Sequence, residues 1–595
     1  MKSMPRGDLR RSGKAARSSQ PGRGMMIMAI LVLISLAVET APANGVGDEV
    51  RAISPHPGRP LTFFTTRNFT GSGRCGLCHS LLADKLGNNL SISDHWRSTM
   101  MANAARDPLW QAKVASEVAR HPSLQKVIEA KCVTCHMPMA WTQARATGEG
   151  DYGDRAIFSG KTGWLDPEAD LHQAAMDGVS CTLCHQILDQ DLGTDATFSG
   201  KFPIDTLVAG PDRSIFGPFR DPLVETMRTS VEFTPKFGAQ VNDSRLCATC
   251  HTLYTPFVDR EGKVAGEFPE QTVYLEWQHS AYYVSPADRR EIGQPGPGRL
   301  CQECHMPHSE TGEVMIARYA PPETEKRDHF SMHHFVGGNV FMLGMLRDNV
   351  SGLGLTASTG KLEKTMERTL RQLRDNGGGL TILEARRRRD TLQVVVQVEN
   401  KAGHKFPGGI PIRRAWLHVT VTDGAGGVIF ESGRPLADGL IEGNGNDENS
   451  AAFEPHYEVI TDPGQVQIYE AIMADTDDAV TYTLLRAARY IKDNRLLPRG
   501  FDKATAPPDV AVYGGAATDE DFVGGGDRIA YMVPLGDPVG PLTVRAELLF
   551  SAVTPAFVRD LARDRNLALV NRFDHMYEGT DKSPVIVATA GATVQ

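Results

Sequence analysis

The pattern of hydrophobic and polar positions changes near residue 380. Beyond that point, short segments alternate with a period of two, as in 391–400, 415–422 and 542–550, and turn sequences such as 423–427 separate them. Such alternation predicts strands that bury one face and leave the other face solvated. We therefore expect an antiparallel β-sandwich of immunoglobulin-like type over about 380–552.

Before residue 380, the spacing of apolar residues is helical or irregular. Residues 107–128 have helical spacing that Pro122 interrupts, and 340–346 and 362–376 predict two further helices. Long loops rich in glycine and proline separate these runs. A last helical run lies near 557–569.

These patterns predict an α+β multidomain protein, in which a mainly α and irregular domain precedes an antiparallel β-sandwich domain. A mature chain of about 550 residues is long enough for two to four domains. The expected parts are a leader at 1–43, a first domain at 44–355, a connecting helix at 356–379, and a β-sandwich domain with a helical tail at 380–595.

The first 43 residues have the three parts of a secretory signal peptide. Residues 2–23 carry seven Lys or Arg and one acid, 25–38 are apolar except for Ser35, and 41–43 supply an A-x-A cleavage site. The alternative is an uncleaved membrane anchor, but the apolar run is shorter than the ~20 residues that span a bilayer. We expect an exported protein, located in the bacterial periplasm or outside the cell.

The mature chain is acidic. Removal of residues 1–43 leaves 56 basic and 70 acidic residues, a formal charge of −14. This balance argues against a nucleic-acid partner, which would select a basic surface. It favours redox partner proteins with a basic surface, because complementary charge steers association.

One five-residue pattern, C-x-x-C-H, occurs five times and uses all ten cysteines. Two thiols three residues apart can reach the two vinyl groups of one porphyrin, and the adjacent histidine can bind its iron. The pattern predicts five covalently bound haem c groups. The expected attachment residues are Cys75, Cys78, Cys132, Cys135, Cys181, Cys184, Cys247, Cys250, Cys301 and Cys304, and the expected proximal ligands are His79, His136, His185, His251 and His305.

Zinc ribbons, redox dithiols and disulfides also use C-x-x-C pairs, and each competes for any single copy. Histidine makes up 18 of 595 residues. Its recurrence after all five pairs by chance has odds of roughly one in ten million, so haem attachment is favoured. No cysteine remains for nucleophilic catalysis. Because the apolar content around the motifs is modest, we expect the porphyrins to form much of the core, and the first half not to fold without them.

The five motifs, with the segments 96–101 (WRSTMM) and 277–282 (WQHSAY), resemble the multihaem cytochromes of the cytochrome c554 and hydroxylamine-oxidoreductase superfamily. The resemblance implies that a W-x-x-S-x-H element often supplies a second axial histidine. Met101 and Tyr282 stand at that place here. Met101 is therefore a candidate distal ligand through its thioether, with a plain packing role as the alternative.

The other candidate distal ligands are histidines in unusual local contexts. Three of them crowd before a Gly-Gly pair at 328–339, and one lies in a Gly/Pro-rich loop at 402–409. Imidazole commonly ligates haem iron, and glycine lets backbone approach a porphyrin. The candidates are His334, His404, His329, His333 and His172.

Two functions follow from the motifs. We favour electron transfer along the bound haems, in which every iron has two axial ligands. The alternative is an oxidoreductase that oxidises or reduces a small nitrogen or sulfur compound at a five-coordinate haem. A third possibility is a subunit of a membrane-associated or filamentous conduit. In the second half, 443–449 contains clustered oxygen ligands suited to calcium, but an exposed turn is favoured there.

Overall fold

The computed structural model describes residues 55–148, 156–160, 163–322, 324–536 and 540–595. The predicted signal peptide therefore lies outside the described residues. The described residues pack as one compact unit, so the domain boundaries expected at 355 and 379 stay a prediction. Among the described residues, no helix has the length and apolar character needed to cross a membrane.

Each C-x-x-C-H motif lies on a short helix and includes its last turn. These helices are α1 (Ser72–His79), α4 (Gln125–His136), α7 (Cys181–Cys184), α9 (Ser244–His251) and α11 (Cys301–His305). Residues three and four apart share one face of a helix. The helical turn therefore presents both thiols and, where it continues, the imidazole on the same side.

Between the motifs, short helices and small strand pairs alternate with irregular loops. The helices are α2 (Ile92–Trp96), α3 (Pro108–Arg120), α5 (Pro138–Ala146), α6 (His172–Met176), α8 (Val224–Val231) and α10 (Val273–Gln278). The strands are β1 (Ser214–Gly217), parallel to β2 (Thr234–Phe237), and β3 (Leu253–Val258), antiparallel to β4 (Val264–Gln271).

The predicted interruption at Pro122 is confirmed. Asp107 caps α3 by accepting hydrogen bonds from the amides of Leu109 and Trp110. The helix ends at Arg120, a 3-10 turn follows at Pro122–Leu124, and α4 begins at Gln125. Proline has no amide hydrogen, so the helix is broken at this position.

Two longer helices lead into the strands. They are α12 (Val340–Asp348) and α13 (Thr359–Asn376), which confirms both expected helices and extends each by a few residues. The side chain of Ser358 accepts a hydrogen bond from the amide of Lys361 and so caps α13.

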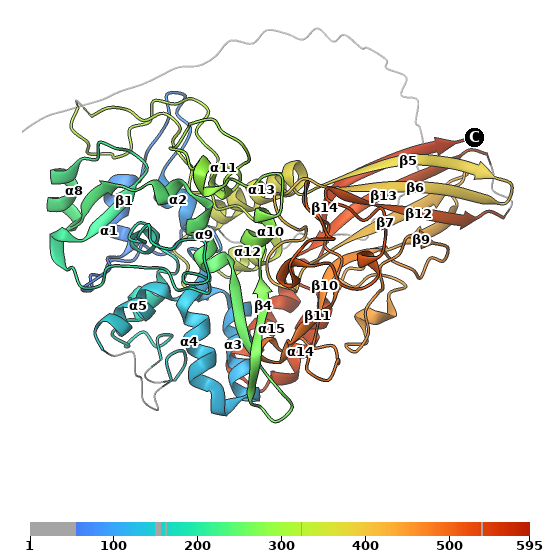
Figure 1. The fold of residues 1–595 in the computed structure, drawn as a ribbon, viewed down its shortest axis with the longest axis horizontal. Coiled ribbons are helices and arrows are strands. Elements are labelled where there is room, and N and C mark those ends of the chain that lie inside the picture. The colour runs from blue at the N-terminus through green and yellow to red at the C-terminus, as the bar shows by residue number, and fades with distance from the viewer. Residues whose placement is uncertain (1–54, 149–155, 161–162, 323, 537–539) are drawn as a thin grey trace, which may run out of the picture. The chain divides into compact units, whose positions relative to one another are not determined.

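The second half contains two sheets that share one core (Figure 1). One sheet has the order β5 (Gly378–Arg388), β6 (Thr391–Asn400), β12 (Gly526–Pro534), β9 (Val459–Ile460). The other has the order β11 (Arg489–Asp493), β10 (Ile468–Ala474), β7 (Arg414–Thr422), β13 (Leu542–Ser551), β14 (Val585–Val594), with β8 (Val428–Ser432) on β7. These pairs are antiparallel except for β12 with β9.

Alternate side chains of β6, β7, β12 and β13 fill the space between the sheets. Val394, Val396 and Val398 of β6 are fully buried, as are Val419 and Val421 of β7. The strands expected at 391–400, 415–422 and 542–550 are thus confirmed, because period two places every second residue in this core.

The end of the chain differs from the expected helical tail. Two helices, α14 (Pro555–Leu561) and α15 (Ala568–Gly579), replace the single run, and the chain then returns to the sheet as β14. Both helices pack against α3. Arg120 of α3 binds Asp560 (2.7 Å) and Asp564 (2.8 Å), so this segment is held against the motif-bearing half.

Candidate functional site

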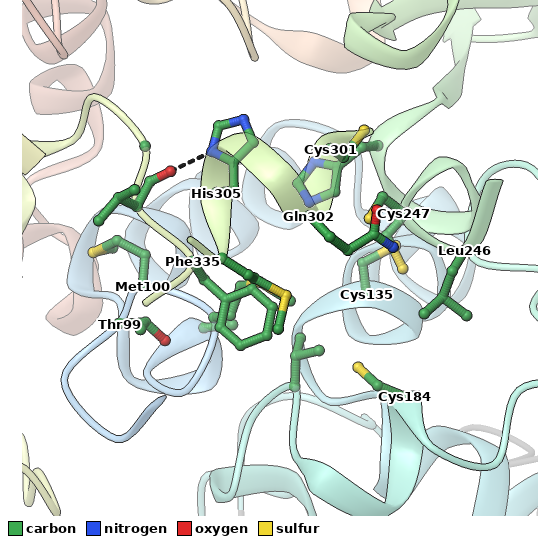
Figure 2. A pocket seen from close by; sticks show the side chains of 18 of the residues that line it. Thr99, Met100, Cys135, Cys184, Leu246, Cys247, Cys301, Gln302, His305 and Phe335 are labelled. Carbon is green, nitrogen blue, oxygen red and sulfur yellow. Dashed lines mark hydrogen bonds between the residues drawn. The ribbon is translucent and has the colours of Figure 1, made fainter. Parts of the chain in front are cut away.

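One cavity of about 930 Å³ brings the five motifs together, although they are spread over 231 residues of sequence. It is lined by all five motif histidines and by nine of the ten cysteines, Cys78 being the exception. Figure 2 shows part of it, where Cys135, Cys184, Cys247 and Cys301 gather from four different motifs.

The motif cysteines do not form disulfides or a zinc cluster. All ten are free thiols. Among the described residues, the one group of three or more His, Cys, Asp or Glu with ligand atoms close enough to share an ion is His456, Asp519 and Asp527, far from the motifs. Structural zinc needs four converging ligands. No such set of four ligands is found among the motif cysteines and histidines of the described chain.

The order of the motifs in space differs from their order in sequence. Thiols of different motifs lie beside one another in three pairs, Cys75 with Cys181, Cys135 with Cys250, and Cys247 with Cys301. Cys184 also lies near Cys247 and Cys250. The first motif is thus next to the third, and the fourth motif neighbours the second, the third and the fifth.

Every motif histidine is oriented through its Nδ1 atom. The pairs are His79 with the carbonyl of Ile316 (2.7 Å), His136 with that of Ala104 (3.2 Å), His185 with that of Phe216 (2.6 Å), His251 with the side-chain oxygen of Gln271 (2.7 Å), and His305 with the carbonyl of Val336. The last contact is visible in Figure 2. An oxygen acceptor places the proton on Nδ1 and leaves Nε2 free to bind a metal.

Burial keeps these rings neutral. Desolvation lowers the pKa of all five motif histidines, and it brings that of His136 and that of His305 to about 4. Iron binds the neutral imidazole, so no proton has to leave Nε2 at neutral pH. The tautomer, the protonation state and the thiol spacing all fit covalently attached haem.

Two further histidines face motif histidines at the separation that a shared iron requires. The ring of His333 lies 6.3 Å from that of His185 at 20°, and the ring of His404 lies 6.4 Å from that of His305 at 9°. Two metal–imidazole bonds of about 2 Å, plus roughly 1.1 Å from each nitrogen to its ring centre, give about 6.3 Å.

Both facing rings also have the required tautomer. Nδ1 of His333 donates to the carbonyl of Ser331 (3.1 Å), and Nδ1 of His404 donates to that of Lys405 (2.8 Å). Their Nε2 atoms are free, like those of the motif histidines. Iron ligation by these two residues stays a prediction that this geometry supports.

The other candidate ligands are placed differently. The ring centre of His334 lies 4.5 Å from that of His95, and the ring of His329 lies beside that of His308. His172 donates from Nδ1 to the carbonyl of Trp164 (2.9 Å) and does not line the cavity, whereas Met101 does. Within the described chain, no second imidazole is paired with His79, His136 or His251 in the manner of His333 and His404.

Several residues of the site carry no signal in the sequence. Trp110 stacks on His136 with ring centres 4.4 Å apart and planes parallel within 1°. Gln271 orients His251 from strand β4. Glu270, next to it, lines the cavity with only 6% of its surface exposed. Trp110 and Gln271 lie outside the motifs, 26 and 20 residues from the histidines they contact, so only their positions in space identify them.

Histidines and acids of the second half have structural roles. His418 lies between Glu431 (2.9 Å) and Glu547 (3.0 Å). Asp447, in the segment considered for calcium, forms a buried ion pair with Arg414. That carboxylate is therefore already neutralised, and it is buried rather than part of the exposed turn expected from the sequence.

No family model matches the chain, and no curated protein matches it. Among solved structures, it is similar to a penta-heme cytochrome c552 from Thermochromatium tepidum, with a TM-score of 0.44 and 14% sequence identity. The match covers 84% of this chain and 96% of that one. At this identity and TM-score, the likeness does not assign a function to the chain.

Proposed function

We propose that the protein is an exported multihaem c-type cytochrome that carries electrons along five covalently attached haems. The observation that carries the proposal is the convergence of five C-x-x-C-H helices on one cavity, each with its imidazole held by Nδ1. When bound, the haems supply reversible one-electron chemistry at iron.

The contacts between motifs support a branched route for electrons. The third motif links the first to the fourth, and the second and fifth motifs each adjoin the fourth, through Cys250 and Cys247. The protein holds these attachment points on rigid helical turns, so the spacing between neighbouring sites is set before any partner binds. The first, second and fifth motifs are the ends of this arrangement and the expected points of entry and exit.

Intact-mass measurement and pyridine haemochrome analysis of the exported protein test the proposal. We expect five haem equivalents per chain. Changing both cysteines of one motif to serine should remove one equivalent, whichever motif is chosen. Zinc in place of haem, or fewer than five equivalents in the unaltered protein, would overturn it.

A second candidate function, oxidoreductase chemistry on a small nitrogen or sulfur compound, is favoured by the surroundings of Cys132. Glu117, Lys113 and Glu270 all line the cavity there and are at most 6% exposed. Lys113 binds Glu117 (2.9 Å). Burial raises the pKa of Glu270 to about 7, which suits a group that gives and takes protons.

These residues favour the motif at 132–136 as the site of such chemistry, since His136 has no paired imidazole within the described chain. Electron paramagnetic resonance of the oxidised protein separates the two functions. A high-spin signal that cyanide converts to low spin, with turnover that falls at least tenfold in Glu270→Gln, would establish the oxidoreductase. Low-spin signals alone would support electron transfer as the function.

We further propose that the protein works outside the cytoplasm with basic redox partners, or within a membrane-associated electron-transfer complex. The acidic balance of the chain after residue 43 supports the first of these. Binding to a basic cytochrome should weaken steeply between 50 and 300 mM salt, roughly as the Debye length shortens. Salt-independent binding would argue against basic redox partners. A strictly monomeric protein with no co-purifying partner would argue against a membrane-associated complex.

A further inference from the structure

A group of basic side chains lies next to the cavity, outside the five C-x-x-C-H motifs. His95 of α2 and His334, one residue after His333, place their rings 4.5 Å apart at 70°. They are 2% and 9% exposed. Arg368 and Arg371 of α13 act on His334 as positive charges, and Arg368 acts on His95 as well. We call these four residues the His95 cluster.

The polar atoms of the two histidines are not satisfied within the protein. Neither ring nitrogen of His95 has a hydrogen-bond partner, and nor does Nε2 of His334. The backbone of Asn89 approaches His95 without reaching hydrogen-bond geometry, so it accounts for one nitrogen at most. A buried polar atom without a partner costs about 1–3 kcal/mol, which indicates that something else binds here.

The charged groups around the two rings determine whether that ligand is a cation or an anion. In the described part of the chain, no carboxylate forms an ion pair with Arg368 or Arg371, although Glu367 lies near Arg368. The nearest acid to His95, Asp94, is already bound by Lys361 (3.1 Å) and Arg97 (3.9 Å). Two guanidinium groups repel a metal cation, whereas guanidinium and imidazole N–H groups both donate to oxyanions.

We propose that the His95 cluster is a binding site for a carboxylate or phosphate-type oxyanion. His95 and His334 donate from the buried side, and Arg368 and Arg371 neutralise the charge from α13. The immediate sequence neighbours Trp96, His333 and Thr369 line the cavity of the motifs.

This position leaves two sources for the anion. One is a propionate of the haem attached at 181–185, since His333 faces His185; this source rests on the proposed function. The other is a free anion from solution. Both anions would accept hydrogen bonds from the same protein donors, so the experiment has to distinguish a propionate from a free anion.

The test compares Arg368→Gln with Arg368→Lys in the haem-loaded protein, by spectroelectrochemical titration of each haem. Loss of one positive charge at a half-buried position disfavours the reduced iron. We expect about a tenfold fall in its equilibrium constant for reduction, or about 59 mV for a one-electron couple. Lysine keeps the charge and should restore most of the potential. Arg374→Gln, which removes an exposed charge from the same helix, is the matched control.

A propionate and a free anion give different results. With a propionate, the potential of the unaltered protein is independent of added inorganic phosphate and one haem alone shifts in Arg368→Gln. With a free anion, the potential or the melting temperature follows phosphate concentration, and Arg368→Gln abolishes the dependence. His95→Gln is a second variant should Arg368→Gln lose haem.

The proposal is overturned if the haem-loaded variants at Arg368 and His95 match the Arg374→Gln control in potential, and phosphate has no effect on any of them. Failure of the proposed function is distinguishable from this outcome, because the chain would then carry no haem to titrate.

Discussion

Replacing Asp493 with asparagine should destabilise the protein by about 3–5 kcal/mol, because it leaves buried cations without their shared carboxylate. Asp493 binds Lys405 (2.7 Å) and accepts two hydrogen bonds from Arg495, both at 2.8 Å. The Lys405 and Asp493 side chains are 0% and 2% exposed. After the change, Lys405 keeps one partner, the carbonyl of Ala511 (2.9 Å).

The companion substitution Lys405→Met should cost less, about 1–3 kcal/mol, since Asp493 remains paired with Arg495. Arg495 in turn binds Glu276 of α10 (2.9 Å), so one complete ion pair survives in the double variant. We therefore expect the double variant to be more stable than Asp493→Asn alone.

Denaturant unfolding, followed by circular dichroism and by the haem absorbance, measures these differences. The control is Asp477→Asn, which breaks the surface pair with Arg260 and should cost less than about 1 kcal/mol. A cost for Asp493→Asn no larger than that of the control would refute the reasoning. So would a double variant whose loss equals the sum of the two single losses.

Further predictions concern the axial ligands, their orientation and acid stability. His333→Ala and His404→Ala should each convert one low-spin haem to high spin in the resonance spectrum, whereas His172→Ala should leave the spectrum unchanged; three equal spectra would refute the assignment. Gln271→Leu removes the hydrogen-bond acceptor of the His251 imidazole. The imidazole then donates less electron density to iron. The potential of one haem should rise by tens of millivolts in redox titration, and an unchanged set of potentials would contradict this. Burial would raise the pKa of Asp493, but its two cationic partners hold it at about 2, below the ~3.9 of an unfolded chain. The resulting stabilisation, on the order of 2–3 kcal/mol, is complete above pH ~4 and is lost as pH falls through 2. Acid unfolding of Asp493→Asn should lack this loss, and an identical acid profile would show that the carboxylate does not contribute.

Much of the fold follows from local patterns. The alternation at 391–400 matches β6 residue for residue, and the interruption of the helix by Pro122 is where the sequence places it. β14 was not predicted. Its second half, 588–593, consists of Ala, Thr and Gly, and its place is set by pairing with β13 rather than by its own pattern. The helices near 557–569 were expected as a tail but pack on α3, since Arg120 finds Asp560 and Asp564 there.

The C-x-x-C-H motifs can also be identified from the sequence, because their pattern is local. Two cysteines and a histidine within five residues lie on one helical turn, so their chemistry is complete in the local sequence. Distal ligands are not local. His333 and His334 are adjacent in sequence, and the sequence favours His334 as the ligand, yet only His333 faces a motif histidine. The choice depends on the backbone there, where Phe335 has a positive φ of 42° and the amide of His334 donates to the carbonyl of Met332.

The sequence by itself predicts five attachment motifs and a proximal histidine in each, and it determines the short helical turns that carry them. Tertiary structure alone decided which motifs are neighbours, which imidazoles meet across an iron position, and that His95, His334 and Arg368 come together beside them. The physical reason is the range of the interactions: helical turns and strand alternation are set by residues a few positions apart. Where a second imidazole faces a motif histidine, it comes from chain far along the sequence: His333 lies 148 residues beyond His185, and His404 lies 99 residues beyond His305.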